Sequence, residues 1–203
     1  MQTSPNLPRP PIQSDDAVAN LRRVFMKWNE DMYPDSPSFL AYLLNHHYSS
    51  VNLAKGAKGL KGSDAHLVSR LVPMSEELGF SLGLAKLRCK VTGTADCESG
   101  DMYYNKRARR GYHDDYGDYY GRGRQPRMEE VMDKVYQLTN AVTLEGKDAM
   151  GGQRTITVDE DDLIPREPFE DMSPDKEEYE GYMGNYPGDV MHWYYRTVLV
   201  IRW

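Results

Sequence analysis

The 203-residue chain has little of the material from which a hydrophobic core is made. Alanine, valine, isoleucine, leucine, methionine, cysteine and the aromatic residues together make up 39% of it, and only 4 residues are phenylalanine. It has no run of about 18 apolar residues, which excludes an ordinary membrane-spanning helix. The core must therefore come from a few limited stretches, and much of the remaining length must be solvated loop.

Cysteine is also scarce. The two cysteines, Cys89 and Cys97, have no pair of histidines near them, so they do not describe a zinc site. We interpret them as reduced thiols of an intracellular protein, in the cytoplasm or nucleus. A disulfide closing the short loop between them is the alternative. The chain has no Gly-rich phosphate loop, no G-x-S-x-G and no C-x-x-C motif.

Positive charge is in the minority, since the formal net charge is −6. This argues against nucleic acid or an anionic membrane surface as a general partner of the whole chain. Residues 1–14 hold four prolines, Pro5, Pro8, Pro10 and Pro11. They contain no apolar segment, so they predict an extended lead and not a secretory signal.

Residues 15–203 predict a single α+β domain that begins with helices. Apolar residues at helical spacing follow Ser14, which suits an N-cap, and predict a first helix. The apolar segment 38–49 predicts a second, shorter helix. A third is expected over 64–78, with Ser63 as its N-cap and Gly79 at its end.

Two details of these elements follow from single residues. Pro73 predicts that the third helix bends or splits, because proline removes a backbone donor. Strands are expected near 80–92, 129–145 and 193–202, with the second of them broken near Asn140.

The expected fold is therefore N-terminal helices packed on a small antiparallel sheet. The residues predicted to form its core are Phe25, Trp28, Leu43, Leu71, Leu84, Val135, Leu138, Trp193, Val198 and Val200.

Between two of these strands the composition changes sharply. Residues 103–127 carry seven Lys and Arg, three Asp and six Tyr, and almost no aliphatic residue. Such a segment cannot bury a core face, so we predict a disordered or mobile basic insertion over 99–127. Arginine and aromatic side chains can bind single-stranded RNA. We favour a loop tolerated outside the core, because the central "HDDYGD" dilutes the positive field.

One spacing suggests metal chemistry. His113 and Asp115 form an H-x-D pair, and His192 with Arg202 follows much later. Two histidines and a carboxylate can hold non-heme iron(II), and an arginine can bind a co-substrate carboxylate. A metal site needs ligands on rigid elements, however, and His113 lies among Tyr, Gly and charged residues. We favour a solvated loop for this pair.

Two further groups of residues contain possible metal ligands, but their order or spacing argues against a metal site. Residues 159–180 hold eleven Asp and Glu against Arg166 and Lys176, but lack the order of an EF-hand loop. We interpret them as a solvated acidic face. His46 and His47 would point about 100° apart on a helix and chelate poorly. No catalytic, cofactor-binding or metal-binding residue is therefore assigned.

Longer motifs carry a resemblance. The segments are "DDLIP", "SPDKEEYEGYMGN" and "WYYRTVLVI", preceded in order by "FLAYLLNHHYS", "LKGSDAHLV" and "SEELGFSLGLAKL". Together they resemble the C-terminal region of a mainly fungal family of prolyl 4-hydroxylase-like iron(II)/2-oxoglutarate oxygenases. The resemblance covers most of residues 20–203 apart from the insertion. Tyr195 departs from it, since the family often has His or Arg there.

The resemblance implies that this chain lacks the catalytic domain. In the family the iron ligands and the co-substrate arginine precede this region, and no residue here matches one of them. Iron(II) and 2-oxoglutarate are thus expected only for a longer parent protein. The chain also stops at "VIRW", where the family continues, so we expect a piece of a longer protein or of a broken gene copy.

Three functions follow as expectations. The leading one is a non-catalytic accessory region that supports the catalytic barrel in cis or contacts a protein partner, with no nucleic acid and no membrane. The second is a stand-alone interaction module, with weak RNA binding through 103–127. The third is a minimal dioxygenase that uses His113, Asp115 and His192.

Overall fold

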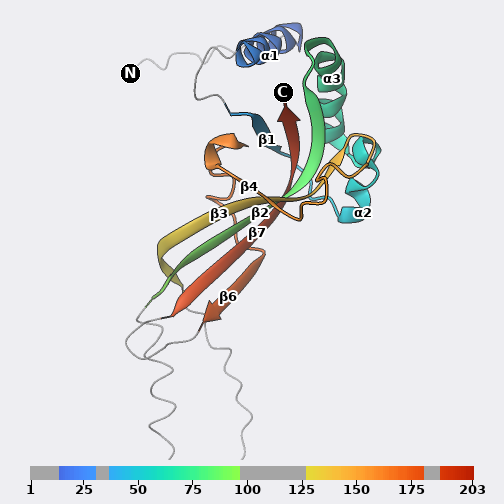
Figure 1. Cartoon of the computed structure of the whole chain (residues 1–203). Coiled ribbons are helices and arrows are strands. Elements are labelled where there is room, and N and C mark those ends of the chain that lie inside the picture. Colours follow the sequence, from blue (N-terminus) through green and yellow to red (C-terminus); the bar gives the residue numbers. More distant parts are fainter. Residues whose placement is uncertain (1–13, 31–36, 97–126, 181–187) are drawn as a thin grey trace, which may run out of the picture.

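The computed structural model of the chain describes residues 14–30, 37–96, 127–180 and 188–203 (Figure 1). The helices are α1 (Ser14–Asn29), α2 (Ser50–Leu53) and α3 (Gly62–Leu78), with short 3-10 helices η1 (Gly56–Gly59) and η2 (Glu160–Asp162). The strands are β1 (Phe39–Leu43), β2 (Ser81–Ala95), β3 (Met128–Thr143), β4 (Ile156–Val158), β5 (Leu163–Ile164), β6 (Lys176–Glu180) and β7 (Asp189–Arg202). The Pro-rich lead up to residue 13, and the expected insertion apart from Arg127, lie outside the described residues.

The strands form one seven-stranded sheet, in the order β4-β3-β2-β7-β1-β5, with β6 paired to β7. Every pair is antiparallel except β1 with β5, which is parallel. The sheet is therefore larger than the small antiparallel one expected from the sequence, and it is mixed. The protein contains both helices and this sheet, which agrees with the broad prediction of an α+β fold.

The last strand lies in the interior of the sheet. Along its whole length β7 pairs with β2. On its other side it pairs with β6 through Asp189–Trp193 and with β1 through Val198–Arg202. Figure 1 shows that β2 and β7 are curved, with an upper half beside the helices and a lower half beside β3 and β6. We call this lower half of the sheet, formed by β3, β6 and the adjoining parts of β2 and β7, the arm. The apolar C-terminal run is thus hydrogen-bonded on both sides.

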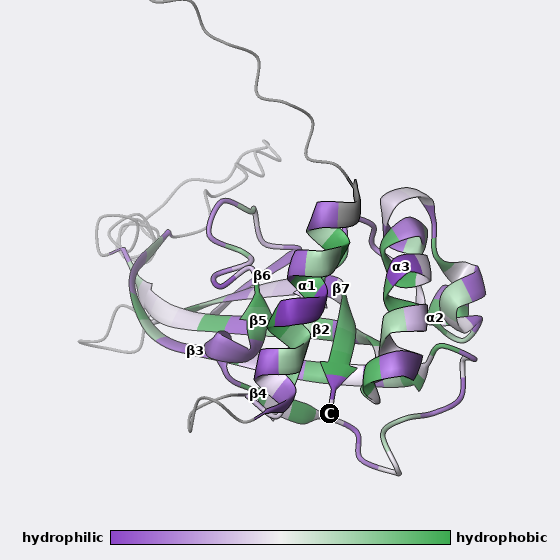
Figure 2. Cartoon of the chain, turned by 90° about the horizontal axis from the view of Figure 1, so that it is seen from above, coloured by the Kyte–Doolittle hydropathy of each residue, from purple (hydrophilic) through white to green (hydrophobic). Residues whose placement is uncertain are grey.

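Successive side chains of the long strands point to opposite faces of the sheet, so the strands contribute to two hydrophobic cores, one on each face. The core beside the helices, the helix-side core, contains Phe25, Leu44, Tyr48, Leu53, Val68, Leu71, Met74, Phe80, Leu84, Leu199 and Ile201. The core on the other face, the loop-side core, contains Ala41, Ala85, Leu87, Cys89, Val91, Tyr136, Leu138, Val158, Leu163, Phe169, Tyr194 and Val198. Coloured by hydropathy, the C-terminal part of β7 is mostly hydrophobic, whereas α1 and α3 are mixed (Figure 2).

The expected helix over 38–49 is wrong. Residues 39–43 form β1, which pairs with β7 on one side and with β5 on the other. A short, continuous apolar run fits a buried strand as well as a helix, and periodicity cannot separate the two. Here Ala41 is 1% exposed between the two neighbouring strands, so tertiary pairing decides the conformation.

The third helix is placed well, with two differences. Gly79 ends α3 in the left-handed region at φ 89°, as its position predicts. The helix starts earlier, however, with Lys61 and not Ser63 at the N-cap, and it continues through Pro73 without splitting. Pro73 is exposed, so its ring needs no room inside a core.

Strand β3 is continuous where a break was expected. Asn140 has φ 50°, and the register with β2 shifts between Leu84 and Lys86 at this point. Asparagine tolerates this conformation better than most residues, and the result is a bulge from which the strand continues. Of the ten predicted core residues, those fully buried are Phe25, Leu71, Leu84, Leu138 and Val198. The other five are half-buried.

Two glycines join the α2–η1 region to the end of β3. The Ala57 N–H donates to the Leu144 carbonyl at 2.8 Å. A Cβ on Gly56 would lie 2.0 Å from the Leu144 carbonyl oxygen, and one on Gly146 would lie 2.1 Å from the Ala54 oxygen. The backbones can approach this closely only because both positions lack a side chain.

Candidate functional site

Of the residues of the iron hypothesis, the structure describes His192 and Arg202. His113 and Asp115 lie outside the described residues. His192 projects from β7 in register with Val91 of β2, and its Nε2 is 4.0 Å from the Glu177 carboxylate. Arg202 lies ten residues further along the same strand, about 30 Å away if that strand were straight. His192 and Arg202 therefore belong to opposite ends of the sheet.

No group of three or more His, Cys, Asp or Glu side chains within the described part of the chain is arranged to hold a metal ion. His192 has one carboxylate beside it, so the described residues supply two of the three ligands that a facial triad needs. We derive no step through iron from them.

A buried carboxylate organises a polar network that the sequence did not predict. Asp64, in the first turn of α3, is 1% exposed. It accepts hydrogen bonds from the Asn45 N–H at 2.9 Å, the His46 N–H at 3.0 Å and the Tyr48 hydroxyl at 2.8 Å. The Nδ1 of His46 lies 2.9 Å from the same carboxylate. These contacts, the Asp64 network, hold the segment after β1 against α3.

The network continues into the sheet. The Tyr48 hydroxyl accepts the Lys61 N–H at 3.0 Å, and the Tyr48 N–H donates to the Thr197 hydroxyl at 3.1 Å. Thr197 lies in β7 and is fully buried. One chain of hydrogen bonds thus connects the start of α3 to the central strand.

The hydrogen bonds of this network change the acidity of its carboxyl. Burial alone raises the pKa of Asp64, but the Asn45 N–H and then the His46 and Tyr48 donors outweigh it, so the pKa is lowered. The imidazole of His46 is half exposed, and its ring packs over Gly62. Asp64 therefore orients His46, while its remaining bonds go to backbone and to Tyr48. This is the pattern of a structural anchor.

His46 and His47 thus lie in a loop after a strand, and not on a helix. Both are exposed. Asp64 could have been suspected from "KGSDAHLV", where an acidic residue precedes an apolar helix. Its burial depends on the loop that covers it, and the sequence does not show that loop's position.

A second group of titratable side chains lies in the loop-side core around Cys89. The thiol is fully buried, and burial raises its pKa to about 11. Burial also raises the pKa of the neighbouring Tyr136 to about 12. Lys134 forms an ion pair with Glu160 at 3.3 Å at the edge of this group. A protonated, enclosed thiol is a poor nucleophile, so Cys89 is a packing residue in a reduced state.

The acidic segment forms a shallow hollow of about 530 Å³ lined by Asp159, Glu160, Asp161, Arg166 and Glu167. Arg166 bridges Asp161 at 3.2 Å, and both side chains are largely exposed. This agrees with a solvated acidic face. Two parts of that segment form strands, β5 and β6. The sequence did not predict these strands, because charged residues dominate the segment.

The surface that stands out lies on the arm, on the sheet face opposite the loop-side core. There β2 presents Lys86, Arg88 and Lys90 at every second position, beside Trp193 and Tyr195 of β7. We call these five residues the cationic–aromatic face. Arg88 Cζ is 5.4 Å and Lys90 Nζ is 5.3 Å from the ring centre of Trp193. All five side chains are half-buried, as expected when long stems cover an aromatic ring.

The charge of this face is not balanced locally. Among the described residues, none of Lys86, Arg88 and Lys90 has a carboxylate within the 4.0 Å of an ion pair. Arg88 donates instead to the neutral amide of Gln137. Glu178 of β6 lies on the same face and is bound to Lys176. The pKa of Glu178 is lowered mainly by that bond, with smaller effects of the Trp193 indole N–H and of Lys90.

The sequence held a signal for this face. In "LAKLRCKVTG", apolar and basic residues alternate over three repeats, which is the pattern of a strand with one buried and one open face. Counting the charge on one parity of the strand finds three cations and no anion. The aromatic half comes from β7, which is distant in the sequence, so only the strand register completes the face.

Comparison with known proteins adds no relative. No protein-family model, no curated protein and no solved structure matches this chain. What the molecule itself defines is an α+β protein with a curled, mixed sheet and a cationic–aromatic face on its arm. Within the described residues, no helix is both long enough and apolar enough to cross a membrane.

Proposed function

We propose that the chain is a non-catalytic accessory region of an iron(II)/2-oxoglutarate oxygenase-like protein, and that it contacts a catalytic domain in cis or a protein partner. Iron(II) and 2-oxoglutarate belong, in this proposal, to that catalytic domain. The proposed location is the cytoplasm or nucleus, where Cys89, a free thiol within the described residues, stays reduced.

The observation that supports the proposal most is the structural use of the segments that carry the resemblance. "WYYRTVLVI" forms most of the central strand β7. "NHHYS" and "KGSDAHLV" are the two sides of the Asp64 network. Asp64 and Tyr48 of these segments are buried, and both accept hydrogen bonds from backbone N–H groups. These structural roles suit a region that supports another domain and does not carry out catalysis.

The arm supports the part of the proposal that concerns contact with another protein or domain. It extends beyond the part of the sheet that α1 and α3 accompany (Figure 1), and its cationic–aromatic face has no ion-pair partner among the described residues. Tryptophan and arginine are the residues that most often dominate protein interfaces. A face of this composition on a projecting sheet suits contact with another polypeptide.

The test has two parts. The transcript should be sequenced upstream of the Met1 codon and beyond the Trp203 codon. We expect an in-frame upstream segment that encodes a strand-borne H-x-D and a later histidine. Close stop codons on both sides would remove the oxygenase context. The purified chain should also be titrated with iron(II) under anaerobic conditions.

We expect this titration to give far less than one iron per chain, with no difference between the protein and its His192→Ala variant. One iron per chain, lost in His192→Ala, would overturn the accessory role and favour the minimal dioxygenase. The matched control is His66→Ala, an exposed histidine on α3. The RNA alternative rests on residues 103–127, which lie outside the described residues apart from Arg127.

A further inference from the structure

We infer that the cationic–aromatic face binds an acidic, extended segment of a protein partner, laid along β2 on the open face of the arm. This inference deepens the proposed function by giving the chemistry of the partner, and it rests on that function only in requiring a polypeptide. Three properties of the face lead to it: the spacing of its cations, its aromatic floor and the distribution of acids around it.

The spacing of the cations matches an extended polypeptide. Lys86, Arg88 and Lys90 occupy alternate positions of one strand, so the outer two are about 14 Å apart. Acidic residues at alternate positions of an extended peptide have the same period. Three carboxylates can therefore oppose three cations in register, each in reach of a charge-assisted hydrogen bond.

The aromatic side chains provide the second property. Trp193 and Tyr195 project from the neighbouring strand on the same face, in register with Lys90 and Arg88 respectively. The methylene stems of the acidic side chains would lie over these rings, whereas the residues between them would point away from the sheet. The cations above Trp193 hold its ring in place, so little side-chain entropy is lost when a partner docks.

The acids around the face select against a long polyanion. Towards the end of the arm, the same face carries Asp133 and Glu130 of β3, which pair with Thr92 and Thr94. Glu180 of β6 pairs there with Asp189 of β7. The cationic stretch is thus about three alternate residues long. A nucleic acid strand would run from it onto carboxylates, whereas a short acidic peptide segment would not.

The experiment measures binding of a fluorescein-labelled peptide, TETETET, to the purified chain by fluorescence anisotropy. The matched peptides TQTQTQT and TKTKTKT have the same length without the negative charge. We expect measurable binding of TETETET only, weakened when NaCl is raised from about 25 mM to about 200 mM, because the charges lie at the surface. Equal binding of TQTQTQT would overturn the inference.

Two double variants locate the site. Arg88→Gln with Lys90→Gln should weaken TETETET binding about tenfold, the effect of two surface charge pairs. Lys58→Gln with Lys147→Gln removes the same charge from exposed positions elsewhere and should change nothing. Equal weakening in both pairs would reduce the effect to net charge and overturn the assignment of the site.

A measurement on the unsubstituted protein covers the possibility that a variant misfolds. In an NMR titration with TETETET, the indole N–H signal of Trp193 should shift, while those of Trp28 and Trp203 in the helix-side core should stay fixed. Shifts confined to the latter two would overturn the inference. Tighter binding of a ten-nucleotide oligouridine, lost in the Arg88 and Lys90 double variant, would assign the face to nucleic acid instead.

These outcomes are independent of the test of the proposed function. Peptide binding at Trp193 in a chain whose transcript lacks an oxygenase domain would leave the inference standing and remove the oxygenase context. An oxygenase domain upstream with no peptide binding would do the reverse.

Discussion

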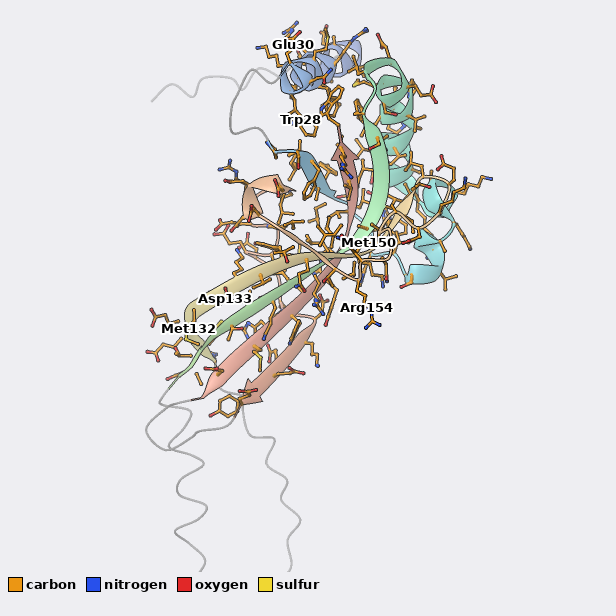
Figure 3. All side chains as sticks on the ribbon, in the orientation of Figure 1. Trp28, Glu30, Met132, Asp133, Met150 and Arg154 are labelled. Atoms are coloured by element: carbon orange, nitrogen blue, oxygen red, sulfur yellow. The ribbon has the colours of Figure 1, made fainter. Side chains whose placement is uncertain are left out.

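The indole of Trp28 in α1 meets the indole of Trp203 edge to face, with 6.0 Å between the ring centres. Trp203 also packs against Phe80 at 5.4 Å, and Trp28 donates its N–H to the Pro37 carbonyl at 2.7 Å. Figure 3 shows Trp28 pointing from α1 towards the end of β7, whereas Glu30 points away from the protein. The first helix is therefore held in place by the residue that follows the last strand.

Removing the Trp203 indole should first weaken the packing of α1 against the sheet. Trp203→Ala should lower the free energy of unfolding by about 2–3 kcal/mol, somewhat less than for a fully buried tryptophan because Trp203 is half-buried. Urea denaturation followed by circular dichroism measures the change. The control, Val24→Ala in α1, is 60% exposed and should change stability by less than about 0.5 kcal/mol. Equal losses would show that the ring contact contributes nothing specific.

The glycine contact between η1 and the end of β3 gives a sharper comparison. Gly146 and Gly152 have similar positive φ values, 83° and 89°, but a Cβ on Gly152 would meet nothing within 4 Å. Gly152→Ala therefore reports the conformational cost alone, about 1 kcal/mol. Gly146→Ala adds a clash with the Ala54 oxygen and should cost clearly more. Thermal melts of the two variants check this, and matching melting temperatures would refute the close approach.

The Asp64 network should show itself in acid. The folded pKa of Asp64 is lowered, so its contribution to stability is complete above its unfolded pKa, near 3.8, and is lost as the pH falls through the folded value. Asp64→Asn should cost about 2–3 kcal/mol at neutral pH. The gap to the unsubstituted protein should narrow below about pH 4.

Urea unfolding of both proteins at a series of pH values measures this gap. Asp171→Asn, at an exposed position, is the control and should show no such dependence. A gap between the Asp64→Asn variant and the unsubstituted protein that stays constant from neutral pH down to pH 2 would mean that folding does not lower the pKa of the Asp64 carboxyl.

The thiol of Cys89 should be inert until the protein unfolds. Its pKa of about 11, against an ordinary value of 9.0 for a thiol, lowers the thiolate fraction near pH 8 about 100-fold. A Cys97→Ser variant leaves Cys89 as the sole thiol. Reaction with Ellman's reagent should then be at least about 100-fold slower in buffer than in guanidinium chloride. Comparable rates in the two solutions would contradict the burial.

How far the sequence reaches can be judged from particular elements. The end of α3 at Gly79 was predictable, because glycine alone adopts φ 89° there without strain. The strands β2, β3 and β7 were predictable from alternation and β-branched residues. The alternation in β2 also carries the three cations, so half of the cationic–aromatic face was present in one short segment.

Other features could not be predicted. Residues 39–43 become β1 because β7 and β5 lie on either side of them, and no local pattern describes those neighbours. The charged residues of β6 form a strand because β7 offers its edge. The burial of Asp64 depends on a loop that reaches it from β1.

The sequence by itself determined where the chain turns and which parity of each long strand is apolar, because glycine conformation and side-chain alternation are local properties. The tertiary structure decided which strands became neighbours, and with that the second core, the Asp64 network and the meeting of Trp193 with Arg88 and Lys90. Those contacts join residues far apart in the sequence, and their free energy exists only once the chain has closed the loops between them.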